Sequence, residues 1–372
     1  MDPTKVFCPN EDCPGRGQIG KGNIWIHSQK EKRYKCLECK RTFSETKCTA
    51  FYRLHKEEET FTLVITLLSH GCPLQAIVAA FGLDERTVSS WRERAGAHCQ
   101  ALHQYFIEKP RDLGQVQCDE LRVKCQGIIL WVAMAIMTSS RLWLGAEISE
   151  HRDMRLIHNL IKRVRRCAAF GVILFCVDGL SSYVKAIWKE FREPVYKSKK
   201  GRPQLKVWEK LCLAQAVKRY QKKRVVEVER RIVIGHGNRV NALIRKSQGK
   251  GVINTAFIER VNATFREHLC CLVRRGRALA VKSKTLQAGV YLVGTVYNFC
   301  SYHKSLRLRS SGEYFQRTPA MAAGITTECW TVRYLLSFAV PPSPWQPPKQ
   351  RGRPSLATKL LIHKWCKPDS TI

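Results

Sequence analysis

Apolar and polar residues follow helical spacing between residues 60 and 98 of this 372-residue chain. Pro73 suits the first turn of one helix, Asp84 is placed to cap another, and residues 81–83 suit a tight turn between them. The pattern therefore predicts a helix, a second helix, a short turn and a third helix. The residues that we expect to face inward are Ala76, Ile77, Ala80, Val88 and Trp91.

From residue 116 onward the pattern changes to strands. Residues 116–124 alternate, and residues 127–137 and 142–148 follow as apolar runs with turns between them, which predicts a three-stranded meander. A basic helix over residues 154–167 leads to residues 171–177, a continuous apolar run typical of a buried strand. This order of elements predicts an α/β fold, in which a mixed sheet is flanked by helices.

The block over residues 254–275 predicts an amphipathic helix that Asn254 or Thr255 is placed to cap. Its polar side is almost wholly basic, apart from Glu259 about one turn into the helix. Arg266 lies roughly two turns further along the same face. A carboxylate beside positive charge suits a metal ion and a phosphate backbone, although Glu259 could merely complement the positive end of the helix dipole. The apolar stripe consists of Ile258, Val261, Phe265, Leu269 and Leu272.

The segment before this block is longer than a minimal domain requires, and we assign a basic insertion to about residues 195–250. Residues 197–206 (KSKKGRPQLK) predict a basic loop. Residues 211–219 and then 224–234 alternate apolar and basic residues as an exposed hairpin does. A solvated insertion would explain this pattern, but its charge favours contact with DNA.

The net charge of the chain indicates what kind of partner the protein binds. The net charge of +34, from 64 Lys and Arg against 30 Asp and Glu, points to a polyanion as partner. A membrane surface is the competing partner, but the longest apolar run, residues 127–137, is much shorter than the about 20 residues that span a bilayer. The N-terminus lacks the hydrophobic core of a signal peptide, so we expect a cytoplasmic, nucleoid-associated protein without a membrane partner.

The chain has 17 Cys, an odd number scattered through apolar segments, which fits a reducing compartment better than a disulfide framework. Cys8 with Cys13 and Cys36 with Cys39 form two close pairs, each carried on a turn. This arrangement suits a tetrahedral Zn²⁺ site that folds a module too small to have a core of its own. Free buried thiols are the alternative.

Between the two cysteine pairs, residues 22–27 and 34–35 are the expected strands of a zinc ribbon. His27 is a possible substitute ligand, because the spacing of the first pair is wider than usual. Such a metal site is structural and does no chemistry.

The helices over residues 60–98 have the layout of a helix-turn-helix, although a plain helical hairpin gives the same pattern. The neighbouring zinc ribbon and the basic charge favour the DNA-binding interpretation. The third helix would then offer a set of polar residues to a DNA major groove. These are Glu85, Arg86, Ser89, Ser90 and Arg92.

Three acids stand at points where a metal could approach them. Asp119 lies on the first predicted strand, Asp178 directly follows the fourth, and Glu259 lies on a later helix. A ribonuclease-H-like domain uses carboxylates in this order to hold two divalent ions, and oxygen ligands favour Mg²⁺ or Mn²⁺.

Glu120 lies beside Asp119 and should point to the opposite face of the strand, so only one of the two can be a ligand. We choose Asp119, which shares a buried-looking register with Gln117 and Leu121.

At the C-terminus a proline-rich linker, residues 341–348, leads to the tetrapeptide Arg351-Gly352-Arg353-Pro354. This resembles an AT-hook, in which Gly lets the chain lie deep in a narrow minor groove while the arginines use its negative potential. An ordinary basic tail is the alternative.

Several stretches resemble DDE transposases of prokaryotic insertion sequences, in particular the group that includes the first-described insertion sequence and its unclassified relatives. The resemblance covers nearly the whole chain and is most specific in the IER-N-T-R block. It implies that Asp119, Asp178 and Glu259 are the catalytic acids and that Arg266 grips a DNA phosphate. Thr255 and Ala256 stand where many such enzymes carry tyrosine and arginine, so contacts to the DNA end must come from elsewhere. The stretches are RYKCLECKRTFS, CDELRVK, VDGLSSY, VINTAFIERVNATFREHLCCLVRR, YNFCSYHKSLR and RTPAMAAG.

The expected protein is a transposase that binds the ends of its own element and cuts and joins double-stranded DNA with Mg²⁺, as a homo-oligomer on DNA. A non-catalytic DNA-binding regulator and a nuclease or resolvase on the same fold are the alternatives. The expected parts are a zinc ribbon over residues 1–50, a helix-turn-helix over 55–108, a ribonuclease-H-like catalytic domain over 112–310 and a basic tail over 311–372.

Overall fold

The computed structural model describes residues 1–196, 202–222, 224–249, 251–273, 282–310, 312–346 and 355–365. Arg351 and Arg353 of the AT-hook-like tetrapeptide lie outside the described residues, as do residues 197–201 of the basic loop. The chain divides into two units, Met1–Glu58 with Leu336–Ile372 and Glu59–Leu335. Each unit is described by itself.

The first unit is built on a three-stranded antiparallel sheet in the order β1 (Ile24–Ser28), β2 (Arg33–Cys36) and β3 (Thr42–Ser44). Tyr34 and Phe43 stack with ring centroids 5.8 Å apart and pack with Ile24 against the buried cysteines. The segment after the second unit returns to this one, because the Val340 N–H donates to the Cys48 carbonyl at 3.2 Å. The unit also holds the short 3₁₀ helix η1 (Pro3–Lys5) and the helix α11 (Leu356–Trp365).

The second unit begins with helices α1 (Glu58–Ser69), α2 (Leu74–Phe81) and α3 (Glu85–Phe106). Asp84 caps α3 as predicted, accepting from the N–H groups of Arg86 and Thr87. Of the residues expected to face inward, Ile77, Val88 and Trp91 are buried as predicted. The prediction is wrong for Ala76 and Ala80, which are exposed. The two-turn helix α2 buries only the stripe around Ile77, so small residues beside that stripe remain outside.

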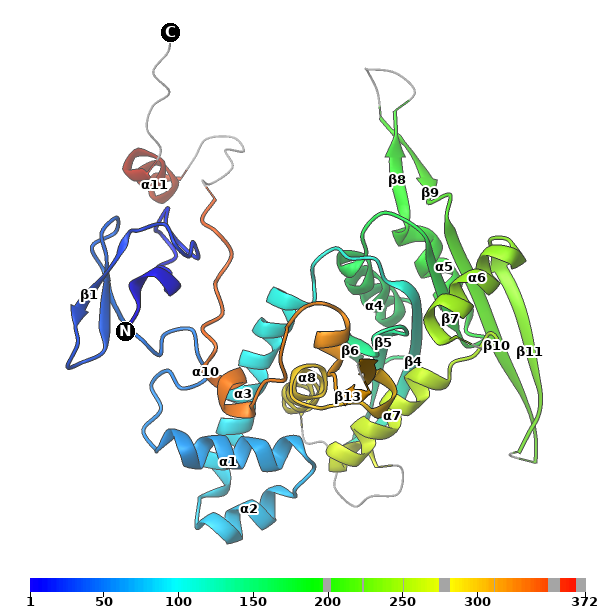
Figure 1. The fold of residues 1–372 in the computed structure, drawn as a ribbon, viewed down its shortest axis with the longest axis horizontal. Helices are drawn as coiled ribbons and strands as arrows, with labels where there is room; N and C mark the ends of the chain where they lie inside the picture. The colour runs from blue at the N-terminus through cyan, green and yellow to red at the C-terminus, as the bar shows by residue number, and fades with distance from the viewer. Residues whose placement is uncertain are drawn as a thin grey trace. The chain divides into compact units, whose positions relative to one another are not determined.

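A six-stranded mixed sheet forms the centre of the second unit, in the order β11-β10-β7-β4-β5-β6 (Figure 1). The predicted meander is confirmed, since β4, β5 and β6 pair antiparallel in sequence order. β7 runs parallel to both β4 and β10, and all five of its residues are buried. The strand bounds are β4 Gly114–Cys125, β5 Ile128–Met137, β6 Leu142–Ser149, β7 Ile173–Val177, β10 Leu211–Gln221 and β11 Arg224–Ile234.

The predicted hairpin of residues 211–219 with residues 224–234 is confirmed, because β10 pairs antiparallel with β11, but the expectation that it is exposed throughout is wrong for the first half of β10. β10 lies inside the sheet, between β7 and β11, and its first residues from Leu211 to Ala214 are buried. Local alternation cannot reveal this, because the burial comes from pairing with β7, more than 30 residues earlier. Between β7 and β10 the chain forms a separate two-stranded sheet of β8 (Arg192–Val195) and β9 (Gln204–Val207).

Helices cover both faces of this sheet (Figure 1). On one face, hydrogen bonds join the sheet to three helices. Gln115 bonds with Ser247 of α6, and Gln117 accepts from the first residues of α7. The Trp143 N–H of β6 donates to Asn298 Oδ1 of α8. On the other face, Glu147 accepts from Arg163 of α4, and α5 packs on α4. The helices that follow α3 along the chain are α4 Met154–Cys167, α5 Ser181–Glu190, α6 Gly237–Gln248, α7 Ala256–His268, α8 Ser283–Phe299, α9 Pro319–Ala322 and α10 Val332–Ser337.

The amphipathic block is confirmed as a helix, but α7 is shorter than its apolar pattern predicts. Leu269 leaves the helical conformation (φ −128°, ψ 101°), and the 3₁₀ helix η2 (Cys270–Leu272) follows. The apolar pattern does not reveal this break, because residues three positions apart lie on the same side of an α-helix and of a 3₁₀ helix. Two small elements complete the second unit, the 3₁₀ helix η3 (Lys304–Leu306) and the hairpin of β12 (Leu308–Ser310) with β13 (Glu313–Phe315). None of the described helices combines the length and the apolar character needed to cross a bilayer.

Candidate active site and metal centres

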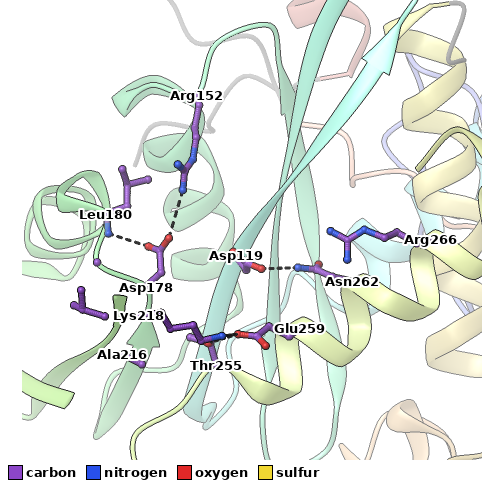
Figure 2. A pocket seen from close by; sticks show the side chains of 12 residues that line it. Asp119, Arg152, Asp178, Leu180, Ala216, Lys218, Thr255, Glu259, Asn262 and Arg266 are labelled. Atoms are coloured by element: carbon purple, nitrogen blue, oxygen red, sulfur yellow. Dashed lines mark hydrogen bonds and ion pairs between the residues drawn. The ribbon is translucent and has the colours of Figure 1, made fainter. Parts of the chain in front are cut away.

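The second unit has a cavity of about 640 Å³ at the end of β7, beside the middle of β4. It receives side chains from both strands, from β10 and from α7, and Figure 2 shows the acidic and basic ones facing one another. Its lining includes all three acids that the sequence singles out. The lining residues are Asp119, Arg152, Asp178, Gly179, Leu180, Ala216, Val217, Lys218, Thr255, Glu259, Asn262 and Arg266.

Asp178 is held by the turn that follows β7. Its Oδ1 accepts from the Leu180 N–H at 2.9 Å, and its carbonyl accepts from Gln215 Nε2 on β10 at 2.9 Å. The parallel pairing of β7 with β4 ends at the pair of Cys176 with Gln117, so the next residues of β4 pair with β5 on one side and have no partner from β7 on the other. The sheet therefore leaves an opening where Asp119 and Asp178 face the cavity.

Glu259 reaches the same cavity from α7, and β4 sets the position of this helix. Gln117 Oε1 accepts from the N–H groups of Phe257 and Ile258 at 2.9 and 3.1 Å, so a side chain of the sheet caps the helix. Thr255 Oγ1 donates to Glu259 Oε1 at 2.7 Å. One strand thus carries Asp119 and also positions the helix that carries Glu259.

The carboxylates of Asp119, Glu120 and Asp178 form one group, with ligand oxygens within 4.8 Å of one another. Glu259 lines the cavity but is outside this group, and its side chain is 45% exposed. The conclusion that only one of Asp119 and Glu120 can join the group of acids is therefore wrong, although the expected opposite faces are confirmed. The side chains of Asp119 and Glu120 do leave opposite faces of β4, toward α7 and Arg152 respectively, but at the open end of the sheet both reach the level of Asp178.

Each acid of the site has a polar or basic partner. Arg152 Nη2 lies 2.7 Å from Glu120 Oε2 and 3.4 Å from Asp178 Oδ2. Asn262 Nδ2 donates to Asp119 Oδ2 at 2.7 Å. Glu259 forms an ion pair with Lys218 of β10, as Figure 2 shows. These partners offset the mutual repulsion of acids that lie so close together.

Burial and mutual repulsion alter the acidity of the group. Burial, followed by the charge of Glu120, raises the pKa of Asp119 to about 7. Burial also raises the pKa of Glu120. A divalent cation at this point would favour the ionised form of both carboxylates.

The donor set fits a hard divalent cation, because it offers only oxygen ligands. The Glu120 side chain is 1% exposed, and its Oε1 is buried without a hydrogen bond of ordinary geometry within the described part of the chain. The Tyr183 hydroxyl lies close to this carboxylate and acts to lower its pKa as a hydrogen-bond donor, but the two do not meet in ordinary hydrogen-bond geometry. A buried carboxylate oxygen without a well-formed hydrogen bond destabilises the fold, unless a cation or a solvent molecule binds to it.

The first unit brings the predicted cysteines together, with the ligand sulfur atoms of all four within 4.8 Å of one another. The Sγ atoms of Cys8 and Cys39 are 3.7 Å apart, and those of Cys13 and Cys36 are 3.8 Å apart. A tetrahedral site with metal–sulfur bonds of about 2.3 Å places its sulfur atoms about 3.8 Å apart. The spacing therefore fits Zn²⁺, and His27, which is exposed on β1, is not part of the group.

Two thiols of this group, those of Cys8 and Cys13, hold their protons tightly when no metal is bound, whereas burial at Cys39 is outweighed by hydrogen bonds, which lower its pKa. Burial raises the pKa of Cys13 to about 12 and also raises the pKa of Cys8. Since thiolates are the metal ligands, binding must release protons to solvent.

The residues proposed for DNA contact on α3 differ in their surroundings. Arg86 and Ser90 are exposed, and Ser89 is half-buried. Arg92 has a buried Nε without a partner within the described residues, and burial lowers its pKa. Arg266 of α7 is half-buried and faces the carboxylate cavity.

The residues that support the acids are not among those predicted from the sequence. Asn262 could have been found, because it lies three residues after Glu259 and so on the same helical face. No sequence pattern places Arg152 or Lys218 near the acids. Arg152 lies in a loop, and Lys218 lies on a strand that the sequence predicts to be part of an exposed hairpin.

No protein-family model matches the chain, and no curated protein matches it either.

Proposed function

We propose that this protein is a DDE-type transposase, which cuts DNA at the ends of an insertion element and joins the freed 3′-hydroxyl to target DNA. The observation that carries the proposal is the single cavity in which Asp119, Asp178 and Glu259 meet Arg152, Lys218 and Arg266. Acids suit metal ions, and the bases beside them suit the phosphates of DNA. The net charge of +34 supports a polyanionic substrate.

A ribonuclease-H-like domain is the finer fold that we propose. Asp119 lies on the first strand of the mixed sheet in chain order, Asp178 follows the fourth, and Glu259 lies on a later helix. This is the order of carboxylates expected for that domain. The antiparallel meander of β4, β5 and β6, with parallel strands on its β4 side, supports it.

In the proposed reaction the acids position and the bases bind. Two Mg²⁺ or Mn²⁺ ions, when bound, supply activation of the attacking oxygen and stabilisation of the leaving one. Asp119 and Asp178 hold one flank of the site, and Glu259 holds the other. Asn262 keeps the Asp119 carboxylate in one orientation through its 2.7 Å hydrogen bond. No side chain of the protein becomes covalently attached to DNA.

Lys218 and Arg152 are the proposed substitutes for the basic residue that is absent before Glu259. Both line the cavity, one from β10 and one from the loop before α4. Each already contacts an acid of the site, so a scissile phosphate there would meet positive charge on both sides of the acids.

The remaining parts are proposed to hold double-stranded DNA and to work in a homo-oligomer. The zinc ribbon and the helix-turn-helix of α1 to α3 would bind the element ends, with Arg86, Ser89 and Ser90 toward the major groove. Because Arg92 has a buried Nε, we assign it to fixing α3 rather than to base contact. The tail with Arg351 and Arg353 would follow a minor groove.

The test uses the purified full chain, a labelled element end and Mg²⁺, with cleavage and joining followed separately. Asp178→Asn should abolish both steps by several orders of magnitude and keep DNA binding, because the amide preserves size but removes charge. Asp153→Asn is the matched control, since Asp153 caps α4 through its side chain and Asn caps equally well. Full activity of Asp178→Asn would overturn the proposal. Binding without cleavage in the unsubstituted chain would indicate a regulator, and cleavage without joining a nuclease.

A further inference from the structure

The outer face of the ribbon sheet carries an aromatic residue that is not packed into the core. Trp25 on β1 is 62% exposed, while the other face of the same sheet buries Ile24, Tyr34 and Phe43. Trp25 lies directly opposite Lys35 on β2, and Lys35 lies opposite Thr42 on β3, so these three share the outer face. A single exposed aromatic residue does not by itself define an interaction surface, but Trp25 shares its face with Lys35 and lies near a charged hollow.

A hollow of about 430 Å³ adjoins the sheet at β3, where Thr42 of the outer face lines it together with Phe43 and with Cys8 of the cysteine group. Thr42 forms part of its wall, so it begins about 10 Å, or two strand spacings, from Trp25. Its volume is within the range of about 300–1,000 Å³ for sites that take a small ligand. Tyr52 provides an aromatic wall, with Lys47 Nζ 4.2 Å from the centre of its ring.

The charges around this hollow are of two kinds. Arg33, Arg41 and Lys47 supply positive charge, and Glu11 and Asp12 supply negative charge. A bare phosphate chain would be repelled by the acids, whereas a nucleotide suits both kinds of group. Its phosphate can meet the bases, and the amino groups of its ring can donate to a carboxylate.

We infer that this outer face binds an unpaired stretch of DNA, with one base stacked on Trp25 and a neighbouring nucleotide in the hollow beside Tyr52. Stacking requires a free base face, which a duplex hides within its own stack. The aromatic residues with basic side chains between them are what a single strand needs, because each nucleotide offers one flat ring and one negative phosphate. The inference rests on the proposed function only for the choice of DNA over RNA.

The test measures binding of the full chain to a labelled single-stranded oligonucleotide and to the same sequence as a duplex. Mg²⁺ is left out, so that no cleavage occurs, and no chelator is added, so that ribbon zinc is kept. Trp25→Ala should weaken single-strand binding about fivefold or more, as expected for one lost stacked base, and change duplex binding less than about twofold. Trp25→Phe should restore most of the single-strand affinity.

Trp188→Ala is the matched control, because Trp188 is 51% exposed on α5 in the other unit and its loss should change neither affinity. Lys47→Met tests the hollow and should lower the salt dependence of single-strand binding by about 0.7 in log–log slope. Equal weakening of single-strand and duplex binding by Trp25→Ala, or no weakening with zinc content intact, would overturn the inference. A chain that binds single strands through Trp25 but never transfers a strand would overturn the proposed function alone.

Discussion

The cysteine group of the first unit and the carboxylate group of the second gather ligands in different ways. The four thiols come from two turns of one small sheet and lie at the sulfur spacing of a closed tetrahedral site. The acids come from β4, β7 and α7, and they face a cavity of about 640 Å³ with arginine, lysine and asparagine among them. The thiols are packed together at metal-ligand spacing, whereas the acids have room for a substrate among them.

We interpret this difference as that between a structural metal site and a catalytic one. A closed thiolate site contributes its binding energy to folding and offers no free position. An open carboxylate site keeps unsatisfied oxygens, such as Glu120 Oε1, and a raised pKa at Asp119, both of which are costly for folding alone. Loss of one ligand should therefore unfold the cysteine site, whereas at the carboxylate site it should weaken metal binding and leave the fold intact.

The largest effect is expected in the ribbon. Cys36→Ser should release the metal and unfold the small sheet, because apparent binding free energies of structural zinc are about 10–16 kcal/mol. The second unit should stay folded, since its core is separate. Metal analysis and circular dichroism check this. Cys48→Ser is the control, as Cys48 is in the same unit and outside the metal group; full zinc in Cys36→Ser would exclude the assignment.

In the cavity, loss of one acid should leave the fold intact and weaken metal binding instead. Glu120→Gln should lower the affinity of the DNA-free chain for Mn²⁺ by about tenfold or more, because its carboxylate is already within the group of Asp119 and Asp178. Glu259→Gln should lower it less, since its carboxylate is outside that group. Titrations followed by electron paramagnetic resonance measure both. The reverse order would show that Glu120 is only the partner of Arg152.

Metal binding in the cavity should depend on pH around neutrality. Asp119, with a pKa of about 7, must lose its proton to bind a cation, so Mg²⁺ affinity should fall up to about tenfold per unit as pH drops below 7. In the metal-free chain the free energy of unfolding should depend on pH in the opposite direction and decrease as pH rises. A carboxyl whose pKa is raised from 3.8 stabilises the fold fully below pH 4, and this contribution is lost as pH rises to about 7.

Denaturant unfolding of the metal-free chain across this pH range measures the stability effect, and calorimetric titration with Mg²⁺ measures the affinity. Asp119→Asn should flatten both profiles, because it removes the titrating group. Unchanged slopes in that variant would assign them to another residue.

The smallest effect is expected from the residue that orients an acid. Asn262→Ala should reduce the rate of cleavage by about 10–100-fold, as is usual for groups that orient a metal ligand, while DNA affinity stays within about twofold. Asn262→Asp places a negative charge against Asp119 and should raise the pKa of that acid further, which moves the pH profile of cleavage upward. An Asn262→Ala variant with unchanged rate would limit Asn262 to a role in packing.

The sequence by itself determined whatever depends on neighbours along the chain. The cysteine pairs, the Asp84 cap, the meander and the bounds of α4 all follow from local spacing, and each is present as expected. Local spacing is sufficient there because the groups concerned lie on one turn, one helix or one hairpin. The placement of an acid directly after a buried strand, Asp178, belongs to the same class.

Only the tertiary structure decided what depends on distant partners. β10 is a sheet strand because it pairs with β7, and Glu120 joins the acids because β7 ends beside it. Gln117 caps a helix about 140 residues later, a contact that no local pattern encodes. A residue pattern records which face of an element is apolar, but it cannot record which strand ends where, and the open end of this sheet is what brings the site together.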